Sequence, residues 1–259
     1  MKPSQSSTPS APDPIPQNSS RALTWLIGAA IATVALWQVP EGQYVLYPFS
    51  ILATWFHEMG HGLTAIAMGG NFEKLMLYPS GSGLAYHSGS LFLGRIGRAL
   101  VSAGGLLGPS IAGMLLLRLS TARLPRVQLG LFGLGLFLLV SALLWVRTVF
   151  GLAIVVAFGV AIASIPLYMP RWMQYFAVQF LGVQACISSY QHLDYLFTER
   201  VSVAGRGLQW SDTGQIAQQL FLPYWFWGGL LALISFGFLI LGLRAVMMQS
   251  LPDAKAGGK

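Results

Sequence analysis

The residues best suited to chemistry in this sequence are His57, Glu58 and His61, which form a His-Glu-x-x-His motif inside an apolar stretch. Residues four apart stand on one face of a helix, so both imidazoles can be presented to a single metal ion. Glu58 would lie about 100° round the helix from His57, near enough to hold and deprotonate a water molecule at that metal. Two histidine ligands and a glutamate base are typical of zinc-dependent hydrolysis, with one Zn²⁺ per chain.

A purely structural explanation is the alternative, in which two histidines face a helix bundle and Glu58 pairs with an arginine. The energetic cost of such an arrangement argues against it. A carboxylate in the bilayer centre costs about 2.5–3.5 kcal/mol on insertion scales, and ionisable groups at that depth mark functional sites. Gly60 and Gly62 would each cost a further ~1 kcal/mol in a helix interior. We therefore expect the motif to be functional.

A catalytic zinc usually takes three protein ligands and leaves one position for water. The remaining histidines and carboxylates near apolar segments are the candidates: Glu73, His87, His192, Asp194, Glu199 and Asp212. We expect Asp194, at the end of a long apolar segment, although carboxylates at helix ends are often simply solvated. The segment from Ser211 to Gln215 is typical of a helix N-cap, which explains Asp212 and leaves it as the reserve ligand.

The composition indicates a multi-pass membrane protein. Of the 259 residues, 54% are hydrophobic and only 9% are charged, against about 25% charged in soluble domains. The net charge of +7 comes from basic residues scattered at expected helix ends, which favours lipid headgroups over nucleic acid as their partner. Cys186 is the one cysteine, so an internal disulfide is excluded and cysteine usage does not report the compartment.

Hydropathy predicts an all-α integral membrane protein, a bundle of about seven transmembrane helices. Residues 1–21 have the composition of a disordered tail, 22–246 form one membrane-embedded domain, and 247–259 are a C-terminal tail. The expected spans are 22–39, 47–68, 99–117, two within 129–168 that separate at Arg147-Thr148, 172–193 and 223–246.

A short β-hairpin is expected directly after the metal-binding helix, with strands at 72–78 and 84–87 around a turn at 79–83. An open strand edge can accept an extended peptide as an added strand. We therefore expect the hairpin at 72–87 to present substrate to the metal, with proline substitutions from Phe72 to Leu77 as the test of its backbone donors. The alternative is a passive surface loop.

Together these features resemble the site-2 protease family of intramembrane zinc metallopeptidases, in its compact branch without a PDZ domain. The resemblance rests on the 57–62 motif, the hairpin after Gly69-Gly70, the Gly-Pro-bearing segment 103–109 and an aspartate on a later span. In that family the third ligand lies in an Asn-x-x-Pro…Leu-Asp-Gly pattern. Leu193-Asp194 matches its central pair, but Tyr195 replaces the glycine and no Asn-Pro precedes it. The resemblance implies cleavage of transmembrane substrates, often in signalling or stress responses.

We therefore expect a zinc metalloendopeptidase that cleaves membrane proteins or peptides within the lipid bilayer of a bacterial-type plasma membrane or an organelle. Its zinc would be held by His57, His61 and Asp194, with Glu58 as the base. Two other functions would use the same residues: a cation or proton transporter, and a zinc-binding scaffold without proteolytic activity.

Overall fold

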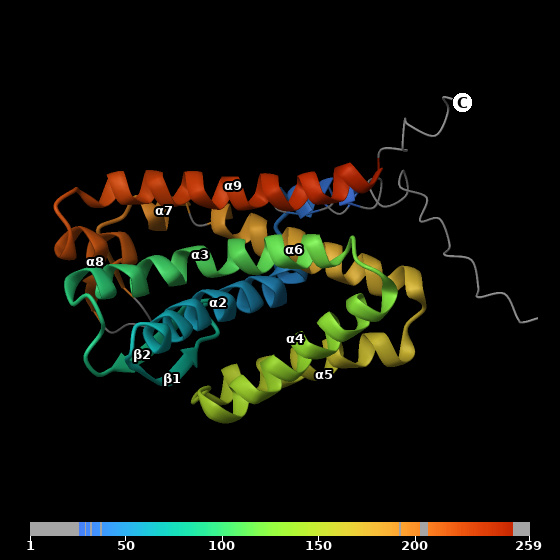
Figure 1. Ribbon diagram of the computed structural model, residues 1–259, viewed down its shortest axis with the longest axis horizontal. Coiled ribbons are helices and arrows are strands. Elements are labelled where there is room, and N and C mark those ends of the chain that lie inside the picture. The colour runs from blue at the N-terminus through green and yellow to red at the C-terminus, as the bar shows by residue number, and fades with distance from the viewer. Residues whose placement is uncertain are drawn as a thin grey trace, which may run out of the picture.

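The computed structural model describes residues 26–28, 30–31, 33–36, 38–191, 193–202 and 207–250. The expected tail at 1–21 lies outside the described residues, as do positions 251–259 of the expected C-terminal tail. Long helices make up most of the described chain (Figure 1). They are α2 (Gly42–Ala67), α3 (Arg95–Leu119), α4 (Leu124–Leu144), α5 (Val149–Tyr168), α6 (Arg171–Gln191) and α9 (Tyr224–Ser250), with the short α7 (Leu193–Leu196) and α8 (Asp212–Gln219) between the last two.

Four helices in the described part are long and apolar enough to cross a membrane, namely α3, α4, α5 and α9. Helices α2 and α6 have similar lengths but are less apolar, since α2 carries the motif and α6 buries Gln174, Gln179 and Gln184. The expected first span, 22–39, is described only in part, as an apolar helix within 26–36. The protein is therefore a multi-pass helical membrane protein, but the expectation of about seven spans is not confirmed.

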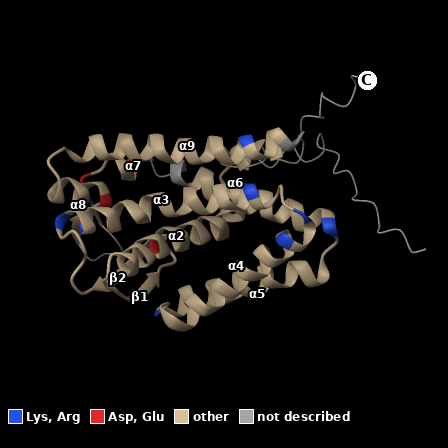
Figure 2. Ribbon diagram, in the orientation of Figure 1, with Lys and Arg blue, Asp and Glu red and all other residues tan. Residues whose placement is uncertain are grey.

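The long apolar stretch at 129–168 divides into α4 and α5, as its length required. The helices separate at Trp145–Thr148, and Thr148 begins α5 by accepting a hydrogen bond from the Gly151 N–H at 3.2 Å. Figure 1 shows α4 and α5 running beside each other, away from α9. Most Lys and Arg residues lie toward the ends of the bundle (Figure 2), where charged groups can reach the headgroup region.

One face of α2 is anchored in the main hydrophobic core. Trp55, Ile51 and Met59 are buried there together with Leu75 of the hairpin and residues of α4. The Trp55 indole Nε1 donates a hydrogen bond to Ser141 Oγ at 3.0 Å. Because His57 lies two residues from Trp55, about 200° round the helix, anchoring this face directs the histidines to the opposite side.

The other side of α2 packs closely on α3 through glycines. A Cβ built on Gly60 would lie 3.1 Å from Gly105 Cα, and one built on Gly108 would lie 2.6 Å from the Phe56 carbonyl oxygen. Small residues let two membrane helices approach until their backbones touch. The close packing expected from the glycines of α3 is thus present, and it places α3 directly against the motif.

The expected hairpin follows α2 as β1 (Asn71–Leu77) and β2 (Gly83–Ser88), paired antiparallel. It folds back along α2, because Thr54 Oγ1 donates to the Gly81 carbonyl at 2.7 Å. The outer edge of β1 is not open, however. Leu75 donates to the Trp145 carbonyl at 2.8 Å and accepts from the Arg147 N–H at 3.0 Å. The expectation that residues 72–77 offer a free edge is therefore wrong, since the α4–α5 connection already occupies that edge.

The polar stretch between α6 and α9 is folded. After α7, strands β3 (Arg200–Ser202) and β4 (Leu208–Trp210) pair antiparallel, and α8 follows directly. Helix α8 packs on α3 and α9 at the end of the bundle that also holds the hairpin (Figure 1). This segment therefore carries residues from late in the chain to the motif on α2.

Candidate active site

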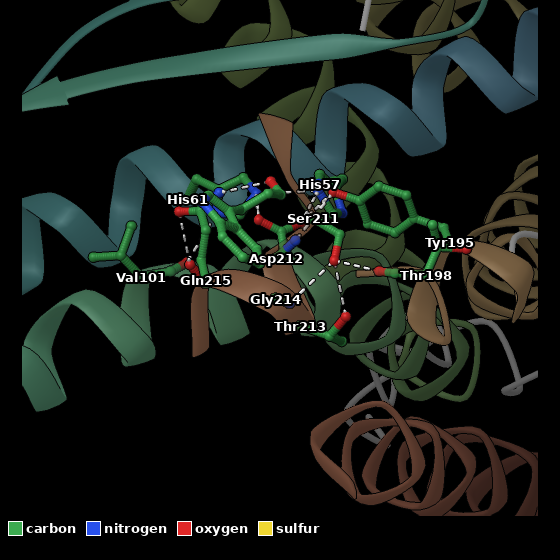
Figure 3. A network of polar contacts seen from close by, with 12 residues as sticks. His57, His61, Val101, Tyr195, Thr198, Ser211, Asp212, Thr213, Gly214 and Gln215 are labelled. Atoms are coloured by element: carbon green, nitrogen blue, oxygen red, sulfur yellow. Dashed lines mark hydrogen bonds and ion pairs between the residues drawn. The ribbon is translucent and has the colours of Figure 1, made fainter. Parts of the chain in front are cut away.

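Three side chains that can bind metal converge between α2 and α8. His57 Nε2 lies 3.1 Å from Asp212 Oδ2, and His61 Nε2 lies 3.4 Å from Asp212 Oδ1. The two histidine Nε2 atoms are 3.0 Å apart. Figure 3 shows the three side chains pointing toward one another. Asp212 is buried, and the histidines are mostly covered.

The donor set fits a zinc ion. Two ligand atoms at about 2.0–2.1 Å from a tetrahedral centre lie about 3.3 Å from each other, close to the 3.0, 3.1 and 3.4 Å separations seen here. Imidazole nitrogens with one carboxylate are a common set at catalytic zinc. The other ring nitrogen of His61, Nδ1, lies 2.9 Å from the Val101 carbonyl of α3, a contact that fixes the ring and directs Nε2 inward.

Asp212 is free to face the histidines because another residue caps α8. The Ser211 hydroxyl accepts a hydrogen bond from the Gly214 N–H at 3.0 Å, so Ser211 is the N-cap and Asp212 is the first helical residue. Burial alone would raise the pKa of the Asp212 carboxyl. The neighbouring charges of His61 and His57, with their hydrogen bonds, instead hold that pKa well below its ordinary value. Asp212 is thus kept as an anion.

The expected third ligand, Asp194, does not belong to this group. It lies in the four-residue helix α7 and its side chain is exposed. The next residue, Tyr195, faces the site instead, about 100° round the helix. The carboxylate that the structure brings to the histidines is therefore the reserve candidate Asp212 and not Asp194, whose side chain lies on a different side of α7 from Tyr195.

Tyr195 is the residue at this site that sequence reasoning missed. Its hydroxyl donates to Asp212 Oδ2 at 2.9 Å, and its ring lies 6.2 Å from the His57 ring, centre to centre. Burial, then the charge and hydrogen bond of Asp212, raise the pKa of Tyr195 well above its ordinary value, so the phenol keeps its proton. The only sequence signal was the departure at this position from the family's glycine.

Glu58 is buried beside the hairpin. A Cβ on Gly83 would lie 2.6 Å from Glu58 Oε1, and the Glu58 carboxylate accepts a hydrogen bond from the Ala85 backbone. His57 and Glu58 both line a cavity of about 290 Å³ between α2, the hairpin turn, α3, α7 and α9. Glu58 therefore stands at the wall of a cavity that reaches the histidine cluster.

The other candidate ligands lie elsewhere. Glu73 and Glu199 are exposed, and His192 is outside the described residues. His87 is exposed near the end of β2, where partial burial and then the charge of His61 lower its pKa below the ordinary value. Among the described residues, the one group of three that could hold a metal ion is His57, His61 and Asp212.

The Peptidase M50B-like family model matches residues 26–242, a range that includes every residue of this site. The chain belongs to this family. The predicted resemblance to the site-2 proteases is therefore confirmed, and no PDZ domain is matched. Searches of curated proteins and of solved structures found no match.

For this M50B-like chain, family and geometry agree on the class of activity. The family indicates a peptidase of the M50 type in a membrane. The described residues supply two imidazoles, a carboxylate and a separate buried glutamate at one cavity.

Proposed function

We propose that this protein is a zinc-dependent endopeptidase that cleaves membrane-embedded proteins or peptides. One observation carries the proposal: a buried carboxylate from late in the chain meets both motif histidines at ligand spacing, while Glu58 lines the adjoining cavity. His57, His61 and Asp212 would hold the metal. A bound zinc ion would supply a Lewis acid that polarises a peptide carbonyl and lowers the pKa of water.

Glu58 supplies the proton transfers. As a carboxylate, it accepts the proton of the attacking water and then gives that proton to the leaving amine. The Ala85 hydrogen bond holds this carboxylate at the cavity wall. Tyr195 and Val101 keep Asp212 and His61 oriented through their hydrogen bonds. The cavity itself supports the proposal, because non-helical peptide is tolerated at membrane depth only inside protein or in a wet cavity.

The free edge of β2 is suited to hold the substrate in extended form. Leu75 turns its backbone N–H and C=O toward the α4–α5 connection. Its partner Ala85 therefore turns its own N–H and C=O away from β1, as do Gly83 and His87 at the alternate positions. The structure describes no third strand on that side. The Ala85 N–H is already bonded to Glu58. An added peptide strand would therefore pair with the Ala85 C=O and with Gly83 and His87, and it would lie across the candidate metal site.

Replacing Glu58 by glutamine tests the catalytic proposal. Glu58→Gln keeps size and hydrogen bonding but removes the base, so cleavage should fall by about two to four orders of magnitude. Elemental analysis should still find about one zinc per chain. The measurement is cleavage of a single-span peptide by purified protein in detergent, with His57→Ala as the variant that should lose zinc.

Other outcomes point to the alternative functions. Undiminished cleavage by Glu58→Gln, or active protein without any transition metal, would end the proposal. Zinc retained without cleavage by the wild type would indicate a scaffold. Metal flux into sealed vesicles would indicate a transporter.

Proline substitution along β2 tests the substrate edge, because proline lacks an N–H and is tolerated where the N–H faces away from the ladder. His87→Pro should keep zinc and fold but lower cleavage about 2- to 10-fold, the equivalent of one net hydrogen bond of about 0.5–1.5 kcal/mol. Leu84→Pro, whose N–H faces β1, should destabilise the hairpin instead. His87→Ala separates loss of the imidazole from loss of the N–H, and equal cleavage by His87→Ala and His87→Pro would leave β2 without this role.

A further inference from the structure

A second pocket, of about 320 Å³, lies on the far side of the candidate metal site from the Glu58 cavity. It is formed where the end of β2, the start of α3, β4 and α8 meet. The residues that line it are polar almost throughout: His87, Arg98, Ser102, Gln209, Trp210, Gln215, Gln218 and Gln219. None of the described residues that line it is acidic. Catalysis as proposed above makes no use of this pocket.

The two pockets lie at opposite ends of the free edge of β2. Strand β2 runs alongside α2 in the same direction, because Gly83 lies against Glu58 while Phe72, the partner of His87, lies against Gly62. The turn residue Ser82 lines the first cavity and His87 lines the second. A peptide added along β2 would therefore pass from one pocket to the other across the candidate metal site.

The pockets differ in chemistry. The wall of the first includes Leu106, Pro109, Leu196 and Leu231, which suit apolar side chains from within the membrane. The second is walled by four glutamine amides and an arginine. A peptide that fits both would be apolar on one side of the cleaved bond and hydrophilic on the other, as a sequence is where it leaves the membrane.

Among the described residues that line the second pocket, Arg98 carries the permanent charge, and it is positive. The Arg98 guanidinium is held at its wall, since Nε donates to Gln219 Oε1 at 2.9 Å. A guanidinium has five N–H donors, so this bond leaves it able to bind a carboxylate as well. Arg200 adds a second cation, its Cζ 4.1 Å from the ring centre of the lining Trp210. A carboxylate brought into this pocket would meet opposite charge.

We infer that this pocket, defined by His87, Arg98, Trp210 and the four glutamines, binds the hydrophilic flank of the substrate and selects an acidic side chain there through Arg98. The inference rests on the proposed peptidase function and names the class of its substrates. Membrane sequences with Glu or Asp in the polar segment next to the cleaved bond are preferred over the same sequences with Lys.

The test uses the full-length protein in neutral phosphatidylcholine vesicles and three peptides. The peptides share a Leu/Ala stretch and a glutamine flank and differ only in one flank residue: Glu, Gln or Lys. The flank is placed at either end in two parallel sets. We expect kcat/KM for Glu to exceed that for Lys about fivefold, the range of one partly exposed ion pair. Arg98→Gln should bring the ratio close to one, and Arg98→Glu should invert it.

Arg95→Gln is the matched control. Arg95 belongs to the same turn of α3 and also bonds α8, through the Gln218 carbonyl at 3.0 Å, but it does not line the pocket. It should leave the ratio unchanged. Because the ratio compares peptides on one protein, a general loss of activity in a variant cancels. A ratio near one in the wild type, or a ratio that Arg98→Gln does not change, overturns the inference.

Binding separates this inference from the peptidase proposal. Anisotropy of labelled peptides on Glu58→Gln protein should rank them Glu, Gln, Lys even where no cleavage occurs. If the wild type cleaves none of the peptides but binds them in this order, the peptidase proposal is wrong and the assignment of the pocket stands. If peptide binding changes when anionic lipid is added but does not depend on the charge of the peptide, the pocket binds lipid headgroups and the inference is overturned.

Discussion

A methyl group at Gly105 is expected to destroy the metal site while leaving the helices in place. In the middle of α3, replacing glycine by alanine should by itself favour the helix by about 1 kcal/mol. However, a Cβ on Gly105 would lie 2.6 Å from His61 Cδ2 and nearer still to Nε2 and Cε1. Carbon atoms in contact normally lie about 3.5–4.0 Å apart. The imidazole would therefore have to withdraw by about 1 Å.

That displacement is large for a metal ligand, since ligand distances are kept within about 0.2 Å. It would also pull Nδ1 from the Val101 carbonyl, now 2.9 Å away. Loss of an outer-shell partner typically lowers metal affinity about 10- to 100-fold. Displacing a direct ligand should cost more, so we expect Gly105→Ala to weaken zinc binding by more than about 100-fold.

Competition with a fluorescent zinc chelator measures this affinity, and circular dichroism during thermal unfolding reports the fold. Gly133→Ala is the control, because a Cβ there meets nothing within 4 Å. It should keep zinc affinity and gain slightly in stability. Wild-type zinc affinity in Gly105→Ala would refute the reasoning, since His61 could not then lie against Gly105 as a ligand.

Two further predictions concern the carboxylate and its partner. Asp212→Asn should lower zinc affinity by more than about 100-fold, beyond the range for outer-shell partners, whereas Asp194→Asn should leave it unchanged in the same chelator titration; the reverse pattern would restore Asp194 as the ligand. Tyr195→Phe keeps the ring but removes the hydrogen bond to Asp212 Oδ2, so zinc should bind about 10- to 100-fold more weakly at unchanged helicity. Unchanged affinity would reduce Tyr195 to a packing residue.

The histidine motif could be predicted from sequence because its geometry is local. A four-residue spacing on one helix fixes where His57 and His61 point, whatever the rest of the chain does. The same holds for the hairpin, which follows from a short pattern of strand and turn residues, and for the division of 129–168, which follows from length. Each of these depends on neighbours in sequence.

Which carboxylate lies beside the histidines depends on packing between distant segments, so sequence reasoning did not place Asp212 there. Asp194 matched a two-residue pattern, but which side of α7 faces the histidines is set by how the 194–222 segment packs. A local signal for Asp212 did exist. Ser211 is a good N-cap on its own, and assigning the cap to Ser211 leaves Asp212 without a structural role.

The number of spans is not confirmed, for a related reason. Hydropathy treats each helix alone, whereas α2 and α6 carry polar groups that face other parts of the protein. Glu58 lies beside the hairpin, and the buried Gln184 donates a hydrogen bond to Thr33. The covered edge of β1 likewise depends on contacts between segments that are far apart in the sequence. Nothing near Leu75 in the sequence indicates that Trp145 and Arg147 bind it.

The placement of the ligands also bears on how the protein is made. Two of the candidate ligands lie on α2, and the third opens α8, which follows α2 through α6 in the order of synthesis. Chains emerge from the ribosome N-terminus first, and distant contacts form late. A nascent chain that has inserted α2 through α6 therefore still lacks the group that completes the site. On the proposed function, such a chain would not yet cleave peptide bonds, because the carboxylate of α8 is still missing from the candidate site.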